Sequence, residues 1–337
     1  MAKAAEKITA HVARAKATAK TGKRIQARID ALDKKAANKN EKKEKPAMQA
    51  GARKYPAPPL PAQHLKKPGT EADLDLQPMY DAPHYKGSEK LKNKVAIVTG
   101  GDSGIGRAVA VLYAREGADV AVFHLDEEED ALETKEAVEA EGRKCIIIQG
   151  DVSDLKFCKD SVAKVIKTFG KLDILVNNAA YQEHVQDFAD LDEEHFDLTI
   201  KTNLYGYYFM AHACVPHMKN GSAIVMTGSV TGLLGNSKLL DYSMTKGGIH
   251  AFTRSLATNL IDKGIRVNAV APGPVWTPLN PADRDAKGVS KFGQDTPMRR
   301  PAQPEEIAPA FVFLAAPSCS SYITGEILPI IGGYSGG

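Results

Sequence analysis

From Lys94 to the C-terminus, short apolar runs alternate with longer segments in which apolar positions recur at helical spacing. The short runs are rich in Val, Ile and Ala, which is typical of parallel strands buried on both faces of a sheet. They predict strands at residues 95–98, 120–123, 144–149, 172–176, 223–226, 265–270 and 326–331. The longer segments predict helices at residues 107–115, 127–141, 155–169, 193–218, 242–263 and 304–315. This alternation predicts an α/β fold with a doubly wound parallel sheet.

A glycine-rich turn follows the first predicted strand. Gly100, Gly104 and Gly106 lie between that strand and the helix that begins near Arg107. Glycine allows a tight turn and a close approach of backbone N–H groups to a pyrophosphate, and a helix N-terminus attracts that negative charge. A glycine-rich turn without a ligand is the alternative. Its place between a strand and a helix favours a Rossmann-type dinucleotide site.

A tyrosine and a lysine lie one helical turn apart in the predicted helix 242–263. Tyr242 and Lys246 share a helix face at this spacing. A nearby cation favours the ionised form of a phenol, so this pair is expected to exchange a proton with a carbonyl or an alcohol near neutral pH. Ser229 follows a predicted strand upstream and is a third candidate. Tyr and Lys at this spacing are more often plain surface neighbours, so the pattern gains weight only beside the dinucleotide motif.

The candidate residues share one position relative to the predicted strands. Gly100, Asp151, Asn178, Ser229 and Pro272 follow the carboxyl ends of five different strands. Open α/β sheets bind their ligands at this edge. The sequence therefore predicts that these residues meet in one site.

Composition narrows the class of protein. The chain has 337 residues, of which 43% are apolar, a usual proportion for a globular protein. No apolar run approaches the ~18 residues of a membrane-spanning helix, and the N-terminus lacks an apolar signal core. The four cysteines form no C-x-x-C pair and no metal-ligand spacing, so we expect free thiols, no metal site and a cytoplasmic location.

Charge divides the chain into unlike parts. Residues 1–54 hold 16 Lys or Arg and 5 Asp or Glu, a net charge of +11, which leaves −8 for the rest of a chain whose total is +3. Their apolar stripe is thin, so we expect residues 1–54 to be disordered or a frayed helix. Residues 55–90 are interpreted as a proline-rich linker and lead-in, and residues 91–337 as the Rossmann-type domain. The apolar stripe consists of Ile8, Val12, Ile25, Ile29 and Leu32.

The basic extension has three interpretations. A solubilising, disordered segment is favoured. Attraction to nucleic acid or to an anionic surface is the second, because clustered cations neutralise phosphates. An organelle-targeting peptide is the third, since Glu6 is the only acidic residue among residues 1–29.

Taken together, the motifs resemble those of the short-chain dehydrogenase/reductase family, in the family's order from about residue 90 onward. Residues 85–88 and 101–108 are similar to one branch, the general-stress oxidoreductases of bacteria and the plant glucose and ribitol dehydrogenase homologues. Residues 1–79 have no counterpart in the family's core. The matching motifs are Thr99–Gly106, Asp151-Val152, Asn177–Ala180, Asn203, Ser229, Tyr242-x-x-x-Lys246 and Pro272–Thr277.

The resemblance implies a catalytic set of Asn203, Ser229, Tyr242 and Lys246. Tyr242 is expected to act as general acid in carbonyl reduction and as general base in alcohol oxidation. Lys246 is expected to lower the pKa of the phenol and to hold the nicotinamide ribose, and Ser229 to bind the substrate oxygen. Asn203 is expected to hold a water of a proton relay. Taken singly, Ser229 can be a turn serine and Asn203 a helix asparagine that satisfies a neighbouring carbonyl.

The resemblance also implies a nicotinamide dinucleotide as cofactor. Within this set, the glycines and Ile105 are expected at the pyrophosphate, Asp151 and Val152 at the adenine, and Asn178 near the ribose. The implied contacts are Gly100, Asp102, Ser103, Gly104, Ile105, Gly106, His124, Asp151, Val152, Asn178, Tyr242, Lys246, Pro272, Gly273, Val275 and Thr277.

The choice between NAD and NADP depends on the end of the second strand. A carboxylate there binds the ribose 2′-hydroxyl and repels a 2′-phosphate, but this position is His124. Ser103 stands where NADP-preferring relatives often carry a basic residue. His124 can donate a hydrogen bond to a phosphate, whereas the acidic run 126–130 repels one. We favour NADP slightly and keep NAD as the alternative.

The substrate pocket is expected under the segment Pro274–Arg300, whose proline, glycine and charge content suits a mobile lid. A mixed polar and apolar wall suits a small sugar, polyol or aldehyde. Candidate wall residues are Tyr181, Gln182, Glu183, Leu233, Leu234 and Trp276.

The predicted helices 193–218 and 242–263 have more apolar residues than one sheet face needs, and the resemblance implies a homotetramer that pairs them. Two other functional classes remain as alternatives. One is a nucleotide-sensing protein without catalysis, and the other is a nucleic-acid-associated protein that acts through its basic extension.

Overall fold

The computed structural model describes residues 2–36 and 46–333. A seven-stranded parallel sheet forms its centre, in the order β3-β2-β1-β4-β5-β6-β7, which confirms the predicted fold class. The direction of winding reverses between β1 and its neighbour β4, and such a switch point opens a crevice at the carboxyl ends of the strands. The strands are β1 Val95–Thr99, β2 Asp119–His124, β3 Cys145–Gln149, β4 Ile174–Asn177, β5 Ala223–Thr227, β6 Arg266–Pro272 and β7 Ile327–Ile330.

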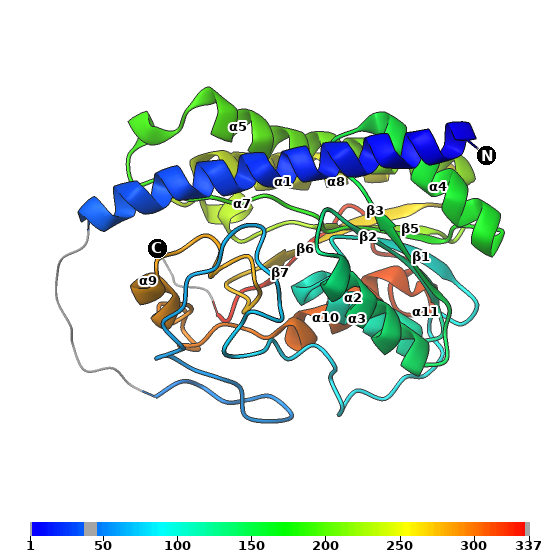
Figure 1. Cartoon of the computed structure of the whole chain (residues 1–337). Helices are drawn as coiled ribbons and strands as arrows, with labels where there is room; N and C mark the ends of the chain where they lie inside the picture. The colour runs from blue at the N-terminus through cyan, green and yellow to red at the C-terminus, as the bar shows by residue number, and fades with distance from the viewer. Residues whose placement is uncertain (1, 37–45, 334–337) are drawn as a thin grey trace.

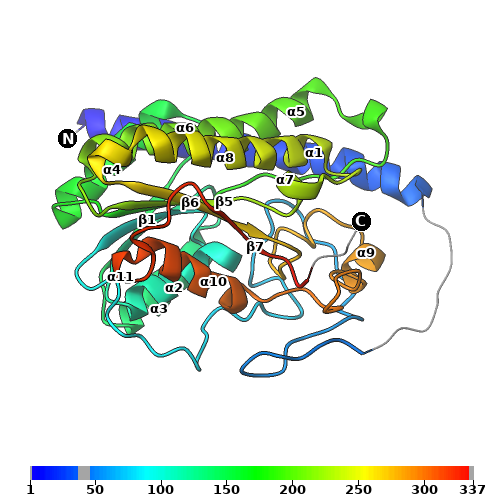
Figure 2. The same ribbon diagram turned by 180° about the vertical axis from the view of Figure 1, so that it is seen from behind.

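Helices cover both faces of the sheet (Figure 1; Figure 2). One layer contains α4 Leu155–Phe169, α5 Glu193–Ile200, α6 Gly206–Cys214 and α8 Leu240–Asn259. The opposite layer contains α2 Gly104–Arg115, α3 Glu128–Ala140, α10 Pro304–Ala315 and α11 Pro317–Ser320. Two short helices, α7 Thr231–Leu234 and α9 Ala286–Ser290, lie in loops at the carboxyl edge of the sheet.

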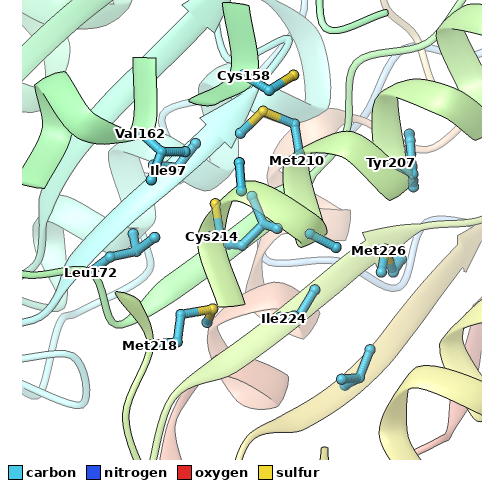
Figure 3. Close-up of a cluster of buried hydrophobic side chains, with 14 of the residues drawn as sticks. Ile97, Cys158, Val162, Leu172, Tyr207, Met210, Cys214, Met218, Ile224 and Met226 are labelled. Carbon is cyan, nitrogen blue, oxygen red and sulfur yellow. The ribbon is translucent and has the colours of Figure 1, made fainter. Parts of the chain in front are cut away.

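Alternate side chains of each strand supply the two halves of the core. Ile97 of β1 packs in the cluster beneath α4 and α6, with Cys158, Met210 and Cys214 (Figure 3). Its neighbour Val98 belongs to the cluster on the other face, which α2 and α10 complete. Burial on both faces explains why the strands are apolar throughout rather than alternating.

The predicted helix 193–218 is interrupted. Between α5 and α6, residues Lys201–Tyr205 form a π-helical turn, and Val215–His217 form a 3₁₀ turn after α6. Pro216 lies in that last turn and lacks the N–H that would continue an α-helix. The π-helical turn holds Asn203, and such turns are frequent at functional sites.

Residues Ala2–Ala36 form one long helix, α1, where we expected disorder or a frayed helix. The apolar stripe is thin, but it packs against the domain: Ile25 and Ile29 are 2% and 1% exposed and form a cluster with Val185. α1 lies on the side of the sheet that carries α5 and α8 (Figure 1; Figure 2). Part of the predicted extension, residues 37–45, lies outside the described residues. Among the helices that are described, none has both the length and the apolar character needed to cross a membrane.

The proline-rich region is extended, as expected, but it is not a loose linker. We call residues 60–76 the strap. Leu60, Leu65 and Leu74 of the strap are buried in a cluster with Trp276 and Phe292. The strap therefore joins the segment Pro274–Arg300, expected to be a mobile lid, to the rest of the domain.

Candidate active site

The glycine-rich turn between β1 and α2 folds back tightly on itself. Gly100 and Gly104 have φ angles of +58° and +51°, which L side chains rarely adopt. A Cβ on Gly106 would lie 1.9 Å from the carbonyl oxygen of Gly100. The backbone conformation here requires glycine at these positions, and it leaves the first turn of α2 facing the edge of the sheet.

A pocket of about 220 Å³ lies above this turn, at the β1–β4 switch point. We call it the dinucleotide pocket. Most of the predicted cofactor contacts line it, as do the acid/base candidates Tyr242 and Lys246. The predicted contacts that line it are Gly100, Asp102, Ser103, Gly104, Ile105, His124, Asp151, Val152, Asn178, Tyr242, Lys246 and Thr277.

A second pocket, of about 180 Å³, adjoins the first. We call it the substrate pocket. Ser229 and the predicted contacts Pro272, Gly273 and Val275 line this pocket rather than the first one. Tyr242 and Thr277 line both pockets and so mark their junction. Gly106 lines neither, and its role is to let the turn close.

Ser229 and Tyr242 both line the substrate pocket, and the Ser229 hydroxyl is close enough to the phenol to oppose the rise of its pKa. The backbone N–H and the hydroxyl of Thr231 both donate to Ser229 Oγ, at 3.1 and 3.0 Å. Because Oγ already accepts two hydrogen bonds, its own proton is directed to a further acceptor. Ser229 is therefore a turn serine, as in the predicted alternative, and its hydroxyl proton remains available to an acceptor in the substrate pocket.

Lys246 is fully buried, and burial lowers the pKa of its ammonium to about 7. Its Nζ donates to the Thr227 carbonyl at 2.8 Å and lies 5.3 Å from the centroid of the Tyr242 ring. A lysine whose pKa lies near 7 can both hold and release a proton at neutral pH.

In the chain without a bound cofactor, burial has a larger effect on the pKa of the Tyr242 phenol than any neighbouring charge. Burial raises the pKa of Tyr242 well above its ordinary value, and the nearby Ser229 hydroxyl opposes this rise. Lys246 faces the ring and the Thr227 carbonyl instead of the phenol oxygen, and desolvation lowers its own charge. The expectation that Lys246 lowers the pKa of Tyr242 stays a prediction for the complex with bound cofactor.

Asn203 lines neither pocket and is fully buried. Its Oδ1 accepts from the backbone N–H of Tyr181 at 2.8 Å, and its Nδ2 donates to the Tyr181 carbonyl at 2.9 Å and to Thr245 Oγ1 at 3.1 Å. The side chain thus ties the loop after β4 to α8, one residue before Lys246. Its role in a water relay stays a prediction.

Asn178 joins the loops that surround the dinucleotide pocket. Its Nδ2 donates to the carbonyl of Gly100 at 2.9 Å, and Thr227 Oγ1 donates to its Oδ1 at 3.1 Å. Thr99 Oγ1 accepts from the backbone N–H of Asn178 at 2.9 Å. These bonds fix the ends of β1, β4 and β5 relative to one another.

Two residues of the N-terminal region belong to the site but were not predicted. Glu71 of the strap accepts from the backbone N–H of Gly104 at 2.7 Å and lies 3.1 Å from Arg107. Burial raises the pKa of Glu71 to about 7, while Arg107 opposes the rise. Thr18 of α1 lines the dinucleotide pocket and donates to Asp151 Oδ2 at 2.6 Å. No motif marks either residue, although Glu71 follows a Pro-Gly pair in an otherwise featureless segment.

An acidic pair lies where the adenosine ribose is expected. Asp102 and Glu127 both line the dinucleotide pocket beside His124. Burial and the nearby charge of Asp102 raise the pKa of Glu127 to about 8. Glu127 is therefore largely neutral at pH 7. Burial also lowers the pKa of His124, so that its ring is neutral there as well.

Glu183, His184 and Asp283 form a buried group beside the substrate pocket, with ligand atoms within 4.8 Å of one another. Lys67 of the strap lies 3.2 Å from Glu183 Oε2 and supplies positive charge. Gln182 and His184 donate to Asp283, at 2.6 Å and at 2.8 and 3.0 Å. The chain's own lysine thus balances part of the acidic charge, and the group links the strap to the lid segment.

Of the predicted substrate-wall residues, only Gln182 lines the substrate pocket. Trp276 is fully buried among the strap leucines, and its Nε1 donates to the carbonyl of Leu76 at 2.8 Å. Leu233 and Leu234 point to solvent instead, with 40% and 62% of their surface exposed. The remaining candidates, Tyr181 and Glu183, contact Lys67. Five of the six predicted wall residues therefore face the strap or solvent instead of the substrate pocket.

Comparison with known proteins identifies the family. Residues 100–335 match a family model described as enoyl-(acyl carrier protein) reductase. General stress protein 39 of Bacillus subtilis is 51% identical over 275 residues, which are 81% of this chain and 96% of that protein. The chain belongs to the short-chain dehydrogenase/reductase family. The resemblance noted from the motifs is thereby confirmed.

Other members of the family are similar over the same share of the chain. Glucose and ribitol dehydrogenase of Daucus carota is 48% identical over 280 residues, 81% of this chain and 96% of that protein. NADPH-dependent aldehyde reductase 1, chloroplastic, of Arabidopsis thaliana is 46% identical over 277 residues, 80% and 96% of the two chains. A short-chain dehydrogenase from Burkholderia cenocepacia, solved in complex with NADP, superposes with a TM-score of 0.68 at 33% identity, covering 72% of this chain and 98% of that one.

The residues present fit a nicotinamide dinucleotide. Glycines stand where side chains would fill the turn below the dinucleotide pocket, and the pocket leads from the acidic pair to Tyr242. As a short-chain dehydrogenase/reductase with these features, the protein is an enzyme that uses NAD or NADP.

Proposed function

We propose that this enzyme transfers a hydride between NADP or NAD and a small alcohol or carbonyl compound, an aldehyde, sugar or polyol, with Tyr242 as general acid and base. The observation that carries the proposal is the position of Tyr242. Its side chain lines both pockets at their junction, and Ser229 lines the substrate pocket beside it. A substrate oxygen in the substrate pocket then lies within reach of both hydroxyls.

The chain's own residues supply the proton chemistry and the charge stabilisation. The bound nicotinamide supplies or accepts the hydride. Tyr242 Oη donates its proton to the substrate oxygen in reduction, and because burial raises the pKa of the phenol this proton is present at neutral pH. Ser229 donates to the same oxygen as negative charge develops there. Lys246, with a pKa of about 7, returns a proton toward the site.

A direct assay tests this proposal. Purified protein is mixed with NADPH or NADH and a panel of small aldehydes and sugars, and the loss of reduced cofactor is followed by absorbance. We expect turnover with at least one neutral aldehyde. If every substrate class leaves the absorbance unchanged although the dinucleotide binds, the nucleotide-sensing alternative gains support instead.

The acidic pair makes the choice of dinucleotide sensitive to pH. We propose that NADP is preferred at neutral pH, because a neutral Glu127 does not repel a 2′-phosphate. Above its pKa of about 8 the group ionises, so the ratio of KM for NADP to KM for NAD is expected to rise several-fold between pH 7 and pH 9.

The Glu127→Gln variant should abolish that rise, since a glutamine keeps the shape of the side chain and does not titrate. Glu136→Gln on the exposed face of α3 is the matched control. A wild-type ratio that stays constant over this range contradicts the assigned role of Glu127.

α1 is expected to contribute to cofactor affinity through Thr18. Replacing Thr18 with Val keeps the β-branched shape but removes the hydrogen bond to Asp151. Hydrogen bonds to charged groups contribute about 1.5–3 kcal/mol, and because this bond positions Asp151 and does not itself contact the ligand, we expect only part of it to appear in binding, as a roughly 10-fold rise in the Kd for dinucleotide. The kcat value should change little.

Thr21→Val, on the same helix, is the control because Thr21 does not line the dinucleotide pocket. Both variants are compared by titration of cofactor fluorescence. Equal affinities would assign α1 a purely structural role.

Basic side chains of α1 form ion pairs with acidic residues of the domain on which it packs. Arg14 lies 3.4 Å from Asp154, and Arg28 lies 2.9 Å from Asp192. These pairs favour intramolecular packing over the proposed attraction to nucleic acid, although Lys16, Lys20 and Lys23 remain exposed.

We also propose the homotetramer and the cytoplasmic location that the resemblance and the composition suggested. Support for the tetramer comes from exposed aromatic residues on the helices expected to pair. Tyr205 and Tyr208 are each 50% exposed, and Met244 on α8 is 49% exposed. Support for a reducing compartment comes from the cysteines, because Cys145, Cys158 and Cys214 are free and buried.

A further inference from the structure

The substrate pocket has one charged residue among the described residues that line it, and that residue is Arg284. It lies in the lid segment, just before α9. Its guanidinium carbon is 5.3 Å from the ring centroid of Phe292, which lines the same pocket. The remaining lining side chains are apolar groups, hydroxyls and amides.

The guanidinium of Arg284 is poorly satisfied by the chain. Its Nε is buried without a hydrogen-bond partner, and no carboxylate within residues 2–36 and 46–333 forms an ion pair with it. The adjacent Asp283 accepts hydrogen bonds from Gln182 and His184 instead, and Arg284 acts on it only as a nearby charge that helps to lower its pKa. A buried donor without a partner costs free energy unless a ligand satisfies it.

Two of the three amide side chains that line the pocket donate hydrogen bonds within the chain. Asn280 Nδ2 donates to the Val275 carbonyl at 2.6 Å and to Thr277 Oγ1 at 3.1 Å, and Gln182 Nε2 donates to Asp283. Arg284 is therefore the lining group with the most unused hydrogen-bonding capacity. A guanidinium presents several N–H donors in a planar fork that matches a carboxylate or a phosphate.

We propose that Arg284 binds an anionic group of the substrate, so that the preferred substrate is a small carbonyl compound, or its alcohol, that carries a carboxylate or a phosphate. The pocket volume of about 180 Å³ limits this substrate to a few carbon atoms. The inference rests on the proposed function, because it assigns the pocket beside Tyr242 to the substrate. It adds that charge, rather than hydroxyl groups alone, selects the substrate.

Matched pairs of aldehydes test the inference. Succinate semialdehyde is compared with butanal, and a glyceraldehyde phosphate with glyceraldehyde, at fixed pH and ionic strength. We expect kcat/KM to be about 10- to 100-fold higher for one anionic member than for its neutral partner, mainly through KM. The pair with the larger ratio identifies carboxylate or phosphate as the recognised group.

Variants of Arg284 test whether this residue causes the preference for anionic substrates. Arg284→Met removes the charge and keeps the length of the side chain. It should lower kcat/KM for the anionic substrate by about 10- to 100-fold. Activity of the variant on the neutral aldehyde shows that the protein is folded. Arg284→Lys should restore part of the loss. Lys287→Met removes one exposed charge from the same segment and controls for general electrostatic attraction.

The outcomes separate the two proposals. If neither the neutral nor the anionic aldehydes react, the proposed function fails. If neutral aldehydes react and Arg284→Met changes both members of each pair equally, the proposed function stands and the inference about Arg284 is overturned. A loss that Lys287→Met reproduces would likewise overturn it, because long-range attraction would then explain the preference.

Discussion

Replacing Tyr242 with Phe is expected to lower kcat for carbonyl reduction by about 10²- to 10⁴-fold, the usual contribution of general acid–base catalysis. The substitution removes one oxygen at the junction of the two pockets and leaves the ring in place. Burial raises the pKa of this phenol, so the wild-type group holds its proton until the substrate oxygen takes it. No other phenol lines either pocket within the described part of the chain.

The measurement is single-turnover and steady-state kinetics together with dinucleotide binding. Affinity for the dinucleotide should stay within a few-fold, because the deleted hydroxyl acts on the substrate. Tyr113→Phe is the matched control: its hydroxyl is also buried, but it donates to the Phe311 carbonyl at 3.1 Å on the other side of the sheet. If Tyr242→Phe keeps wild-type kcat, the proton must come from another group and the proposed mechanism is wrong.

The pH dependence of the reaction involves Lys246 as well as Tyr242. A pKa of about 7 places the change of charge of Lys246 in the working range of most enzymes. The chain alone stabilises the neutral phenol, so alcohol oxidation, which needs a phenolate, depends on positive charge from the oxidised nicotinamide. This difference favours reduction at neutral pH and oxidation at higher pH.

Local sequence was sufficient to predict the part of the site that depends on short-range geometry. The order of strands and helices, the glycine turn and the Tyr242–Lys246 spacing all follow from patterns within a few residues. Each is set by backbone sterics or by helical periodicity. The pockets accordingly bring together residues such as Gly100, Ser229 and Tyr242, which the motifs had identified.

The electrostatics of the site could not be predicted in the same way. Spacing placed Lys246 next to Tyr242, but the pKa of each group depends on burial by residues from distant segments. Lys246 is 0% exposed, and this desolvation lowers its pKa to about 7, which the spacing alone does not show.

Long-range packing of polar segments was also missed. α1 is basic and has few apolar residues, so its composition resembles that of a disordered segment. Its order comes from contacts with partners far along the chain, such as Asp151 for Thr18, 133 residues away. Trp276 was misplaced for a related reason, since only the fold shows that the strap leucines surround it.

Replacing Gly106 with Ala is expected to prevent high-affinity dinucleotide binding, with a rise in Kd of about 100-fold or more. A Cβ at this position would lie 1.9 Å from the carbonyl oxygen of Gly100 and 2.8 Å from the Gly101 Cα. Both obstacles are backbone atoms of the turn that the pyrophosphate is expected to contact, so the turn itself must shift. Alanine favours a helix by about 1 kcal/mol over glycine, but overpacking of this kind costs about 1–3 kcal/mol.

Gly247→Ala in α8 is the matched control, because its nearest neighbour would be the Gly232 carbonyl oxygen at 3.6 Å, an ordinary contact. This control should stabilise the protein by about 0.5–1 kcal/mol through helix propensity, whereas Gly106→Ala should destabilise it. Thermal unfolding with and without NADPH shows whether Gly247→Ala stabilises the protein and Gly106→Ala destabilises it. Since an intact turn is needed for ligand binding, the stabilisation that NADPH gives the wild type should be largely lost in Gly106→Ala. Retention of the full NADPH-dependent shift in that variant would show that the pyrophosphate binds elsewhere.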